Sequence, residues 1–331
     1  MSKPTVFVSR VPPGSALEKL RTECEVRLWE QDSPTPREVL LAELAQCDGI
    51  FAMLTERLDA EALEAAPRLR VISNMAVGYD NIDIPAATAR GIPVGHTPGV
   101  LTETTADLAF ALMLAAARRL PEGERYVRGG QWKTWSPTVL LGQDIYGATL
   151  GIIGFGRIGQ AVARRAQGFN IKQFYYGGGN IQVARELNVH PCKLDDLLRD
   201  SDFVSLHVPL SEKTHHLIGA RELALMKPTS ILINTARGGV VDPKALYEAL
   251  ANGQIGAAAL DVTEPEPISP DDPLLTLDNC LIVPHIGSAT VATRARMADM
   301  AADNLLAGLR GERLPHCVNP AVYEGHGGSL T

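Results

Sequence analysis

Short apolar runs alternate along the chain with segments in which Ala, Leu, Arg and Glu recur at helical spacing. The first series of runs occupies residues 5–9, 25–28, 49–54, 71–74 and 93–95, with helical segments such as 36–46 and 60–66 between them. The second series occupies residues 149–154, 172–176, 203–207, 230–234, 257–261 and 281–283. Strands that alternate with helices in this way are typical of βαβ units and parallel sheets. The pattern therefore predicts an α/β protein with two parallel sheets.

Three further segments belong to neither series of strands. Residues 102–120 are rich in Ala and Leu and apolar on most sides, which predicts a buried helix. Residues 121–142 contain Trp132 and Trp135 but little regular periodicity. We expect this segment to be an arm that packs on another molecule, most simply a second copy of the chain. Residues 290–310 have helical spacing and follow the last strand, so this helix could return to the first domain.

Composition and charge narrow the class of protein. The 331 residues include 45% hydrophobic and 21% charged positions, which is typical of a globular protein. No segment approaches the roughly 20 apolar residues that a membrane span needs. The N-terminus lacks the features of a signal peptide and residues 329–331 form no recognised address, so we expect a cytoplasmic protein. A formal net charge of −7 disfavours nucleic acid as the main partner.

The five cysteines are far apart in the sequence and include no C-x-x-C pair. Their odd number and wide spacing argue against a disulfide framework and against a zinc site, and they fit a reducing compartment. We therefore expect no metal ion. The expected partners are small molecules and a second copy of the chain.

A glycine motif of the form G-x-G-x-x-G occupies residues 154–159, directly after an apolar strand and before a helical segment. In this setting Gly154 permits a tight turn, Gly156 lets backbone N–H groups approach a pyrophosphate, and Gly159 allows the helix to pack closely on the strand. The N-terminus of the helix then stabilises the phosphate charge. The motif predicts a dinucleotide-binding site.

The residues after the second strand of this domain bear on the choice of cofactor. An Asp or Glu about 20 residues beyond the glycine motif usually binds the ribose 2′-hydroxyl of NAD. Here the strand is followed by three glycines and Asn180, so the carboxylate is absent, and the Arg expected for NADP is absent as well. A nest of backbone groups around Gly178, with Asn180 hydrogen-bonded, could bind the 2′-phosphate, which favours NADP(H) over NAD(H). The alternative is a flexible loop that accepts both cofactors.

Three segments that follow strands contain side chains suited to acid–base chemistry. Arg237 offers a planar set of donors that suits a carboxylate, although it could also be a surface residue. His285 can donate and accept protons near neutral pH, although a buried structural histidine is the alternative. Glu266, between two prolines, could orient the histidine and stabilise its charged form, whereas its rival Glu264 is expected to be solvated.

With these motifs in order, the sequence resembles the D-isomer-specific 2-hydroxyacid dehydrogenases over almost its whole length, and most closely the glyoxylate/hydroxypyruvate reductases. The matching stretches lie at 77–83, 101–109, 154–159, 235–238, 261–267 and 284–290. The resemblance implies a Rossmann-type cofactor domain and a flavodoxin-like substrate domain, both doubly wound, with a cleft between them. The implied domains are 1–99 with 288–331 for substrate, and 100–287 for the dinucleotide, including a dimerisation arm at 121–142.

The resemblance also implies roles for individual residues. Arg237, Glu266 and His285 are the implied catalytic residues. Asp261 is implied to lie near the cofactor carboxamide, and Trp135 to enter the site of a partner subunit. The full set of expected cofactor residues is Thr104, Gly154, Gly156, Arg157, Ile158, Gly159, Gly178, Asn180, Val208, Pro209, Thr235, Asp261 and Gly287. The expected substrate residues are Leu54, Val77, Gly78, Trp135, Arg237, His285 and Ser288.

The expected function is NAD(P)H-dependent reduction of glyoxylate and hydroxypyruvate to glycolate and D-glycerate by a homodimer. Leu54 and Trp135 would narrow the site and favour small substrates. One alternative keeps the fold and changes the substrate to a bulkier 2-oxo acid, formate or phosphite. A substrate without a carbonyl has no need of this proton donor, which disfavours formate. A second alternative is a binding protein related to the C-terminal-binding-protein corepressors, but the chain has no nuclear-targeting basic cluster.

Overall fold

The computed structural model describes residues 3–324 and divides the chain into two compact units. One unit consists of the residues up to Leu101 together with those from Ala289 onward, and the other of Thr102–Ser288. The sequence analysis placed these boundaries after residues 99 and 287. Residues 329–331, which were expected to carry no targeting signal, lie outside the described residues.

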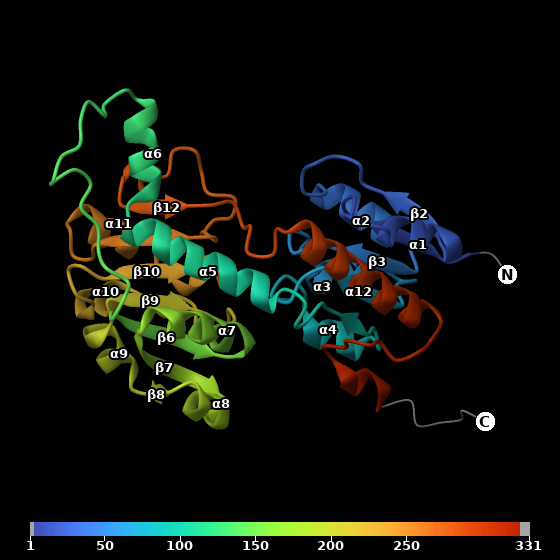
Figure 1. Cartoon of the computed structure of the whole chain (residues 1–331). Coiled ribbons are helices and arrows are strands. Elements are labelled where there is room, and N and C mark those ends of the chain that lie inside the picture. The colour runs from blue at the N-terminus through green and yellow to red at the C-terminus, as the bar shows by residue number, and fades with distance from the viewer. Residues whose placement is uncertain (1–2, 325–331) are drawn as a thin grey trace. The chain divides into compact units, whose positions relative to one another are not determined.

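The first unit contains a sheet of five parallel strands (Figure 1). Its strands are β1 (Thr5–Val8), β2 (Glu25–Leu28), β3 (Gly49–Ala52), β4 (Val71–Asn74) and β5 (Val94–Gly95), in the order β2-β1-β3-β4-β5. Every residue of β3 and β4 is buried, as expected for strands covered by helices on both faces. This strand order is the flavodoxin-like form of the doubly wound fold.

The helices of the first unit are α1 (Ala16–Glu23), α2 (Arg37–Leu44), α3 (Ala60–Glu64), α4 (Ile84–Ala89) and α12 (Val291–Leu309). The last of these comes from the C-terminal part of the chain and packs against β3, β4 and α1. Its contact with the sheet is close, because a Cβ atom on Gly308 would lie 2.5 Å from a methyl carbon of Val71. Helix α12 is therefore an integral part of the first unit.

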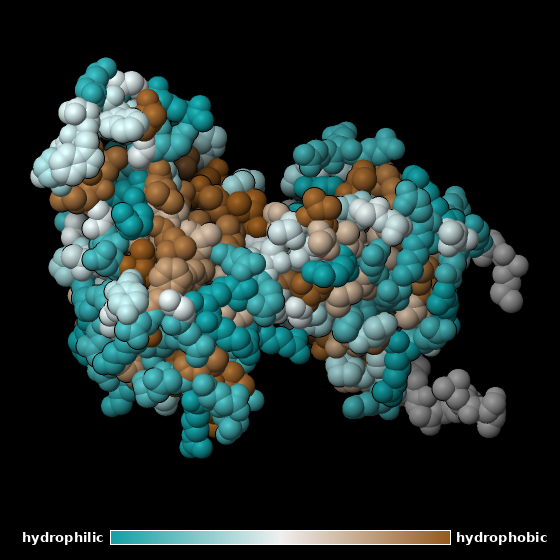
Figure 2. Space-filling view, viewed as in Figure 1, coloured by the Kyte–Doolittle hydropathy of each residue, from teal (hydrophilic) through white to brown (hydrophobic). Residues whose placement is uncertain are grey.

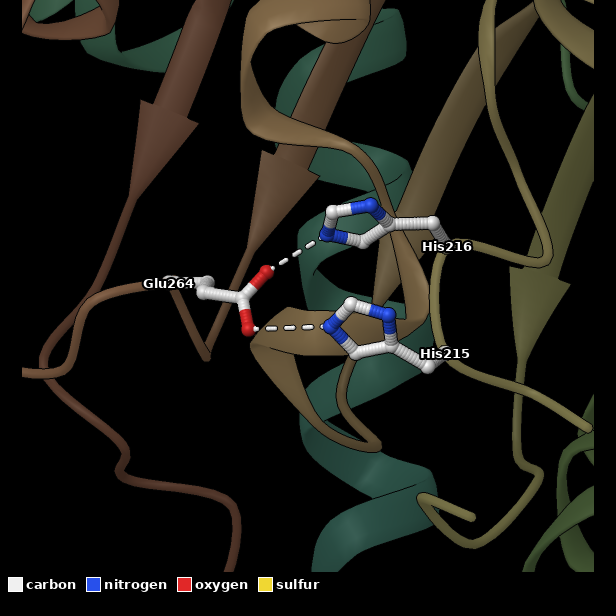
Figure 3. Close-up of side chains that lie close together, drawn as sticks. All are labelled: His215, His216 and Glu264. Carbon is white, nitrogen blue, oxygen red and sulfur yellow. Dashed lines mark hydrogen bonds and ion pairs between the residues drawn. The ribbon is translucent and has the colours of Figure 1, made fainter. Parts of the chain in front are cut away.

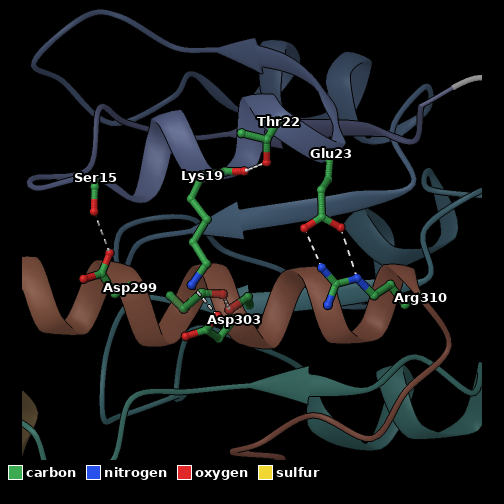
Figure 4. A network of polar contacts seen from close by, with 9 residues as sticks. Ser15, Lys19, Thr22, Glu23, Asp299, Asp303 and Arg310 are labelled. Carbon is green, nitrogen blue, oxygen red and sulfur yellow. Dashed lines mark hydrogen bonds and ion pairs between the residues drawn. The ribbon is translucent and has the colours of Figure 1, made fainter.

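Polar side chains join α1 to α12 along their exposed edges (Figure 4). Arg310 donates through Nε to Glu23 at 3.0 Å, Lys19 pairs with Asp303, and the Ser15 hydroxyl lies 3.4 Å from Asp299. Exposed pairs of this kind contribute about 0–1 kcal/mol each. Burial of the apolar face of α12 is therefore the larger stabilising contribution.

The second unit contains a sheet of seven parallel strands in the order β12-β11-β10-β9-β6-β7-β8 (Figure 1). The strands are β6 (Thr149–Phe155), β7 (Lys172–Gly179), β8 (Val189–Pro191), β9 (Phe203–Leu206), β10 (Ile231–Asn234), β11 (Ala257–Leu260) and β12 (Cys280–Ile282). The strand order reverses between β6 and β9, which defines the switch point where doubly wound sheets bind ligands. The sequence analysis missed β8, a three-residue edge strand that ends in proline.

The helices of the second unit are α5 (Thr102–Ala117), α6 (Leu120–Arg128), α7 (Arg157–Ala166), α8 (Ile181–Glu186), α9 (Leu194–Asp200), α10 (Ala220–Leu225) and α11 (Pro243–Ala251). The buried helix expected at 102–120 is confirmed by α5, whose Ala106, Phe110 and Met113 belong to the core. Within residues 3–324, none of the helices combines the length and the apolar character that crossing a membrane requires.

The expectation of an irregular arm at 121–142 is partly wrong, because its first part is the helix α6. Helix α6 is amphipathic but has only nine residues, none of them buried, so its periodicity is a short signal. Residues 129–148 contain neither helix nor strand, and in Figure 1 α6 and the following loop extend away from the sheet. Trp132 and Trp135 lie on this loop and are exposed.

Candidate functional site

Five strands of the second unit end at the same edge of its sheet. Strands β11, β10, β9 and β6 are neighbours, and β12 lies beside β11, all parallel. The segments that follow them therefore lie side by side at the carboxyl edge. These segments contain the glycine motif, Val208 and Pro209, Arg237, Asp261 and Glu266, and His285.

The glycine motif forms the turn from β6 into α7. Gly154 has a φ of +94°, and a Cβ atom there would lie 2.6 Å from the carbonyl oxygen of His207. A Cβ atom on Gly159 would overlap the carbonyl oxygen of Gly154. Both positions therefore exclude larger residues, for the reasons of tight turning and close helix–strand packing that the motif predicts.

The N-terminus of α7 suits a phosphate group. Gly156 is the N-cap residue, and no side chain of the described residues caps the helix there. A Cβ atom on Gly156 would have no other atom within 4 Å, so the first backbone N–H groups are accessible. Nearby, the Thr235 hydroxyl is buried and has no hydrogen-bond partner within residues 3–324. An open helix N-terminus and an unsatisfied buried hydroxyl at the same edge fit a bound dinucleotide.

The structure extends the second strand of this unit beyond residue 176, where the sequence analysis ended it. Strand β7 continues through Gly179, which pairs with Phe155 of β6 after a shift in register, and Gly177 has a φ of +96° within the strand. A Cβ atom on Gly179 would lie 2.7 Å from the Cβ of Phe155, which explains the need for glycine. Asn180 follows as the N-cap of α8, and its Oδ1 accepts hydrogen bonds from the backbone N–H groups of Gln182 and Val183. Its oxygen therefore has a capping role that the sequence analysis did not foresee.

His207, which the sequence analysis did not single out, follows β9 and precedes Val208 and Pro209. Its Nε2 lies 2.8 Å from the hydroxyl of Ser205, and its backbone N–H donates to Ile153. Burial of the imidazole lowers the pKa of His207 to about 4. His207 is therefore neutral near pH 7, next to the glycine turn.

The buried side chain of Asn234 shapes the turn that presents Arg237. Its Nδ2 donates to the carbonyl oxygen of Arg237 at 2.9 Å, and its Oδ1 accepts from the N–H of Ala236 at 3.0 Å. A Cβ atom on Gly238 would overlap the carbonyl oxygen of Thr263, so this turn lies against the segment that follows β11. The sequence analysis missed Asn234 because its last-in-strand position gives no sign of these partners.

Glu266 and His285 lie together, as their expected roles require. Nδ1 of His285 is 2.5 Å from Oε1 of Glu266. His285 has a φ of +50°, an unusual conformation for a residue other than glycine. Its backbone N–H donates to the carbonyl oxygen of Asp261 at 2.9 Å. Glu264, expected to be solvated, is 37% exposed, and its Oε2 lies 2.8 Å from Nε2 of His216.

Asp261 holds the segment that carries His285. One carboxylate oxygen accepts from the N–H of Ile286 at 2.6 Å and the other from the N–H of Gly287 at 2.8 Å. The side chain is 2% exposed, and this burial raises the pKa of Asp261. A Cβ atom on Gly287 would lie 2.9 Å from the carboxylate, so glycine is needed there. Both carboxylate oxygens therefore have backbone partners, and the expected contact with a carboxamide stays a prediction.

The remaining residues predicted for this unit lie near the ends of its elements. Arg157 and Ile158 begin α7, and Thr104 lies in the first turn of α5. Ser288 follows the 285–287 turn, and Trp135 is 78% exposed on the loop after α6.

The first unit contains the other predicted substrate residues, each just beyond a strand. Leu54 follows β3, and the adjoining loop is fixed by buried Glu56, which accepts from Ser9 and from the N–H of Met53. Val77 and Gly78 follow β4, and Asn74 donates to the carbonyl oxygen of Gly78 at 3.0 Å. Because β3 and β4 are parallel neighbours, these residues share one edge of the sheet.

Comparisons with known proteins extend over nearly the whole chain. The chain is 54% identical to a glyoxylate reductase of Korarchaeum cryptofilum over 324 residues, 97% of this chain and 98% of that one. The crystal structure of the TT0316 protein from Thermus thermophilus has a TM-score of 0.89, with 47% identity and 95% and 99% of the two chains covered. An NADPH-dependent glyoxylate/hydroxypyruvate reductase from Sinorhizobium meliloti, in complex with NADP and malonate, has a TM-score of 0.84, with 33% identity and 97% and 98% covered.

The family match agrees with the second unit. Residues 110–287 match the family described as D-isomer specific 2-hydroxyacid dehydrogenase, NAD binding domain. The strand order and the glycine turn of that unit are those of a Rossmann dinucleotide-binding fold. This chain therefore belongs to the D-isomer specific 2-hydroxyacid dehydrogenase family.

Proposed function

We propose that this protein reduces glyoxylate and hydroxypyruvate to glycolate and D-glycerate, using a reduced nicotinamide dinucleotide. The observation that carries the proposal is the 2.5 Å contact between His285 and Glu266 at the carboxyl edge of the sheet, at which the glycine turn also lies. Reduction of a 2-oxo acid needs a proton donor and a carboxylate-binding cation, and this edge offers His285 and Arg237. The name of the Korarchaeum relative, glyoxylate reductase, supports the substrate class.

Three residues of the chain have separate roles in the proposed reaction. When bound, the reduced nicotinamide supplies a hydride to the carbonyl carbon of the substrate. His285 donates a proton to the carbonyl oxygen through Nε2, the ring nitrogen opposite Glu266, which completes the hydroxyl group. Glu266 stabilises the charged imidazole through Nδ1, and Arg237 holds the substrate carboxylate. A positioned acid of this kind contributes roughly 10²–10⁴ in rate.

The other substrate contacts are proposed from both units. Backbone N–H groups of Val77 and Gly78 bind the substrate carboxylate, while Leu54 narrows the site. Ser288, beside His285 in sequence, adds a hydroxyl. In this scheme the first unit is the substrate-binding domain and the second unit the dinucleotide-binding domain.

The proposed cofactor is NADPH, in preference to NADH. Residues 177–180 contain no carboxylate that would repel a 2′-phosphate, and the Sinorhizobium relative binds NADP. Gly178 has open space around it, and Asn180 still has its amide nitrogen for the phosphate. The residues proposed to bind the rest of the cofactor are Thr104, Gly154, Gly156, Arg157, Ile158, Gly159, Val208, Pro209, Thr235, Asp261 and Gly287.

The proposed assembly is a homodimer formed through the arm. Figure 2 shows hydrophobic residues on the visible face of the second unit, over α5 and beside α6. A groove of about 730 Å³ in this unit is lined by apolar residues such as Ala116 and Leu141 and by charged residues such as Arg119 and Glu122. Exposed apolar residues gathered beside charged ones fit an interface between subunits. In the dimer Trp135 enters the site of the partner subunit.

A cytoplasmic location is part of the same proposal. All five cysteines are free thiols, although Cys24 and Cys47 are buried in the same unit. Free thiols are usual in a reducing compartment.

The proposal is tested by steady-state rates with glyoxylate, hydroxypyruvate, pyruvate, phenylpyruvate and phosphite. We expect the highest kcat/KM with glyoxylate or hydroxypyruvate. Faster turnover of phenylpyruvate would indicate a bulkier natural substrate, and turnover of phosphite a different reaction. The absence of turnover with every substrate would overturn the proposal and favour a binding protein.

A further inference from the structure

A second group of chemically active side chains lies in the second unit, separate from the His285 pair. It consists of His215, His216 and Glu264 (Figure 3). Nε2 of His216 lies 2.8 Å from one carboxylate oxygen of Glu264, and Nε2 of His215 lies 3.4 Å from the other. The two imidazole rings are stacked, with centroids 3.9 Å apart and an angle of 21° between their planes. All three side chains therefore direct a ligand atom toward one point.

An unusual backbone conformation produces this arrangement. Side chains of consecutive residues in extended chain point to opposite sides, so neighbouring histidines rarely stack. His216 has a φ of +49°, in the left-handed region, and its ring lies on the same side as that of His215. Backbone hydrogen bonds from His215 to Ser211 and from His216 to Gly239, both 2.8 Å long, hold the segment in place.

Gly239 lies beside the carboxylate of Glu264 and leaves room for it. A Cβ atom on Gly239 would lie 2.9 Å from Oε1 of Glu264 and 3.4 Å from the ring of His215. Glycine at this position therefore leaves the room that the carboxylate occupies between the loop and the rings. Positive φ at a histidine costs on the order of 1 kcal/mol or more, so the arrangement is held against a backbone preference.

We propose that His215, His216 and Glu264 bind a divalent transition metal ion of the zinc class. Two imidazoles and one carboxylate are a ligand set found in zinc sites that keep a position for water. The three ligand atoms lie within 4.8 Å of one another. Two ligands of a tetrahedral zinc ion lie about 3.4 Å apart at ordinary bond lengths, so small side-chain movements suffice to coordinate it.

The charges and the exposure of the cluster also suit an ion. The carboxylate of Glu264 offsets part of the charge of the ion. The side chains are 50%, 37% and 37% exposed, so an ion can reach them from solvent. A bound ion would join the segment 211–218 to the segment 263–267, which also carries Glu266.

The test is calorimetric titration of zinc chloride into the full chain, prepared without a histidine tag and freed of metal by a chelator. Three variants remove one ligand each: His215→Gln, His216→Asn and Glu264→Gln. Asparagine is chosen at 216 because it tolerates the left-handed conformation better than most residues. His190→Gln is the matched control, since His190 is an exposed histidine of the same unit outside the cluster. Near-ultraviolet circular dichroism establishes that each variant is folded.

We expect one zinc ion per chain in the unmodified protein and in His190→Gln. Each of the three ligand variants should bind zinc at least about tenfold more weakly, as expected for a ligand atom of the metal. Absence of saturable binding in the unmodified protein would overturn the proposal. Unchanged binding in all three variants, or binding that is lost only in His285→Gln, would also overturn it. None of these outcomes depends on the reduction of glyoxylate, so the proposed function is judged separately.

Discussion

The imidazole of His285 and the carboxylate of Glu266 are joined by a hydrogen bond of 2.5 Å, although they lie 19 positions apart in the sequence. They meet because β11 and β12 are parallel neighbours, so the segments that follow these strands lie together. His285 has a positive φ, a conformation that costs on the order of 1–3 kcal/mol and persists only where its surroundings fix it. Asp261 provides that constraint through Ile286 and Gly287. Contacts within the protein therefore fix the backbone that carries His285.

Two alanine substitutions in the glycine turn should affect different properties, cofactor binding in one case and stability in the other. Gly156→Ala adds a methyl group into open space, so the free energy of unfolding should change by less than about 0.5 kcal/mol. The same methyl group blocks the approach of a pyrophosphate, so the Kd for NADPH should rise at least about tenfold, which fluorescence titration measures.

Gly159→Ala is the matched counterpart. Its Cβ atom would overlap the carbonyl oxygen of Gly154, so we expect a loss of about 1–3 kcal/mol in unfolding free energy by urea denaturation. If Gly156→Ala binds NADPH as tightly as the unmodified protein, the phosphate does not lie at this turn.

A carboxylate at the end of β7 should shift the choice of cofactor. Gly178 has open space around it and no positive φ, so Gly178→Asp fits without strain. The new charge repels a 2′-phosphate and can bind a ribose hydroxyl. We expect kcat/KM with NADPH to fall at least about tenfold while kcat/KM with NADH is maintained or rises.

The control for this substitution is Gly168→Asp, which adds the same charge at another open position of the unit. Initial rates with both cofactors are compared for all three proteins. A clear preference of the unmodified protein for NADH would contradict the proposed cofactor. Equal losses with NADPH and NADH in Gly178→Asp would place the 2′-position elsewhere.

Asp261→Asn separates two roles for the buried carboxylate. If Asp261 positions His285, the amide leaves one of two backbone N–H groups unsatisfied, which costs about 1–3 kcal/mol locally and misplaces the ring. In that case kcat with glyoxylate should fall at least about tenfold while the Kd for NADPH stays nearly unchanged. A weakened Kd with unchanged kcat would instead show direct contact with the cofactor. Asp271→Asn, on an exposed loop of the same unit, is the control.

His207 should make the protein less stable in acid. Its pKa is about 4 in the folded protein, and about 6.5 is usual for histidine in an unfolded chain. Between these values the unfolded chain binds a proton that the folded protein excludes, so the free energy of unfolding falls as the pH is lowered from about 6.5 to about 4. The full loss is on the order of 3 kcal/mol.

Urea denaturation of the unmodified protein and of His207→Gln, at about pH 7 and about pH 4.5, measures this contribution. The variant should lose less stability across this interval than the unmodified protein. His190→Gln, which changes an exposed histidine, should behave like the unmodified protein. Identical losses in His207→Gln and the unmodified protein would show that His207 is not the group responsible.

The sequence predicted both sheets because their central strands are continuous Val, Ile and Phe runs between amphipathic helices, a pattern that depends on local residues alone. It missed α6, whose amphipathic pattern spans only nine residues and includes no buried one. It also placed the glycines at 177–179 after the end of the strand, whereas β7 includes them. Gly179 instead lets β7 approach Phe155 closely, and that neighbour lies in another strand.

In the candidate site, too, the sequence predicted some residues and missed others. Arg237 and His285 could be proposed because a residue that follows a parallel strand necessarily lies at the carboxyl edge. The residues that position Arg237 and His285 could not be predicted, because their hydrogen-bond partners are not evident from local sequence. Asp261 accepts hydrogen bonds from residues 25 and 26 positions away, and His216 meets Glu264 at a separation of 48. Folding alone brings these groups together.

The central claim is that His285 donates the proton in the reduction of glyoxylate. The most direct measurement is kcat for His285→Gln at saturating glyoxylate and NADPH, with the Kd for NADPH determined on the same preparation and His190→Gln as control. Our account predicts a fall in kcat of roughly 10²–10⁴ with cofactor binding retained. A kcat near that of the unmodified protein would contradict it.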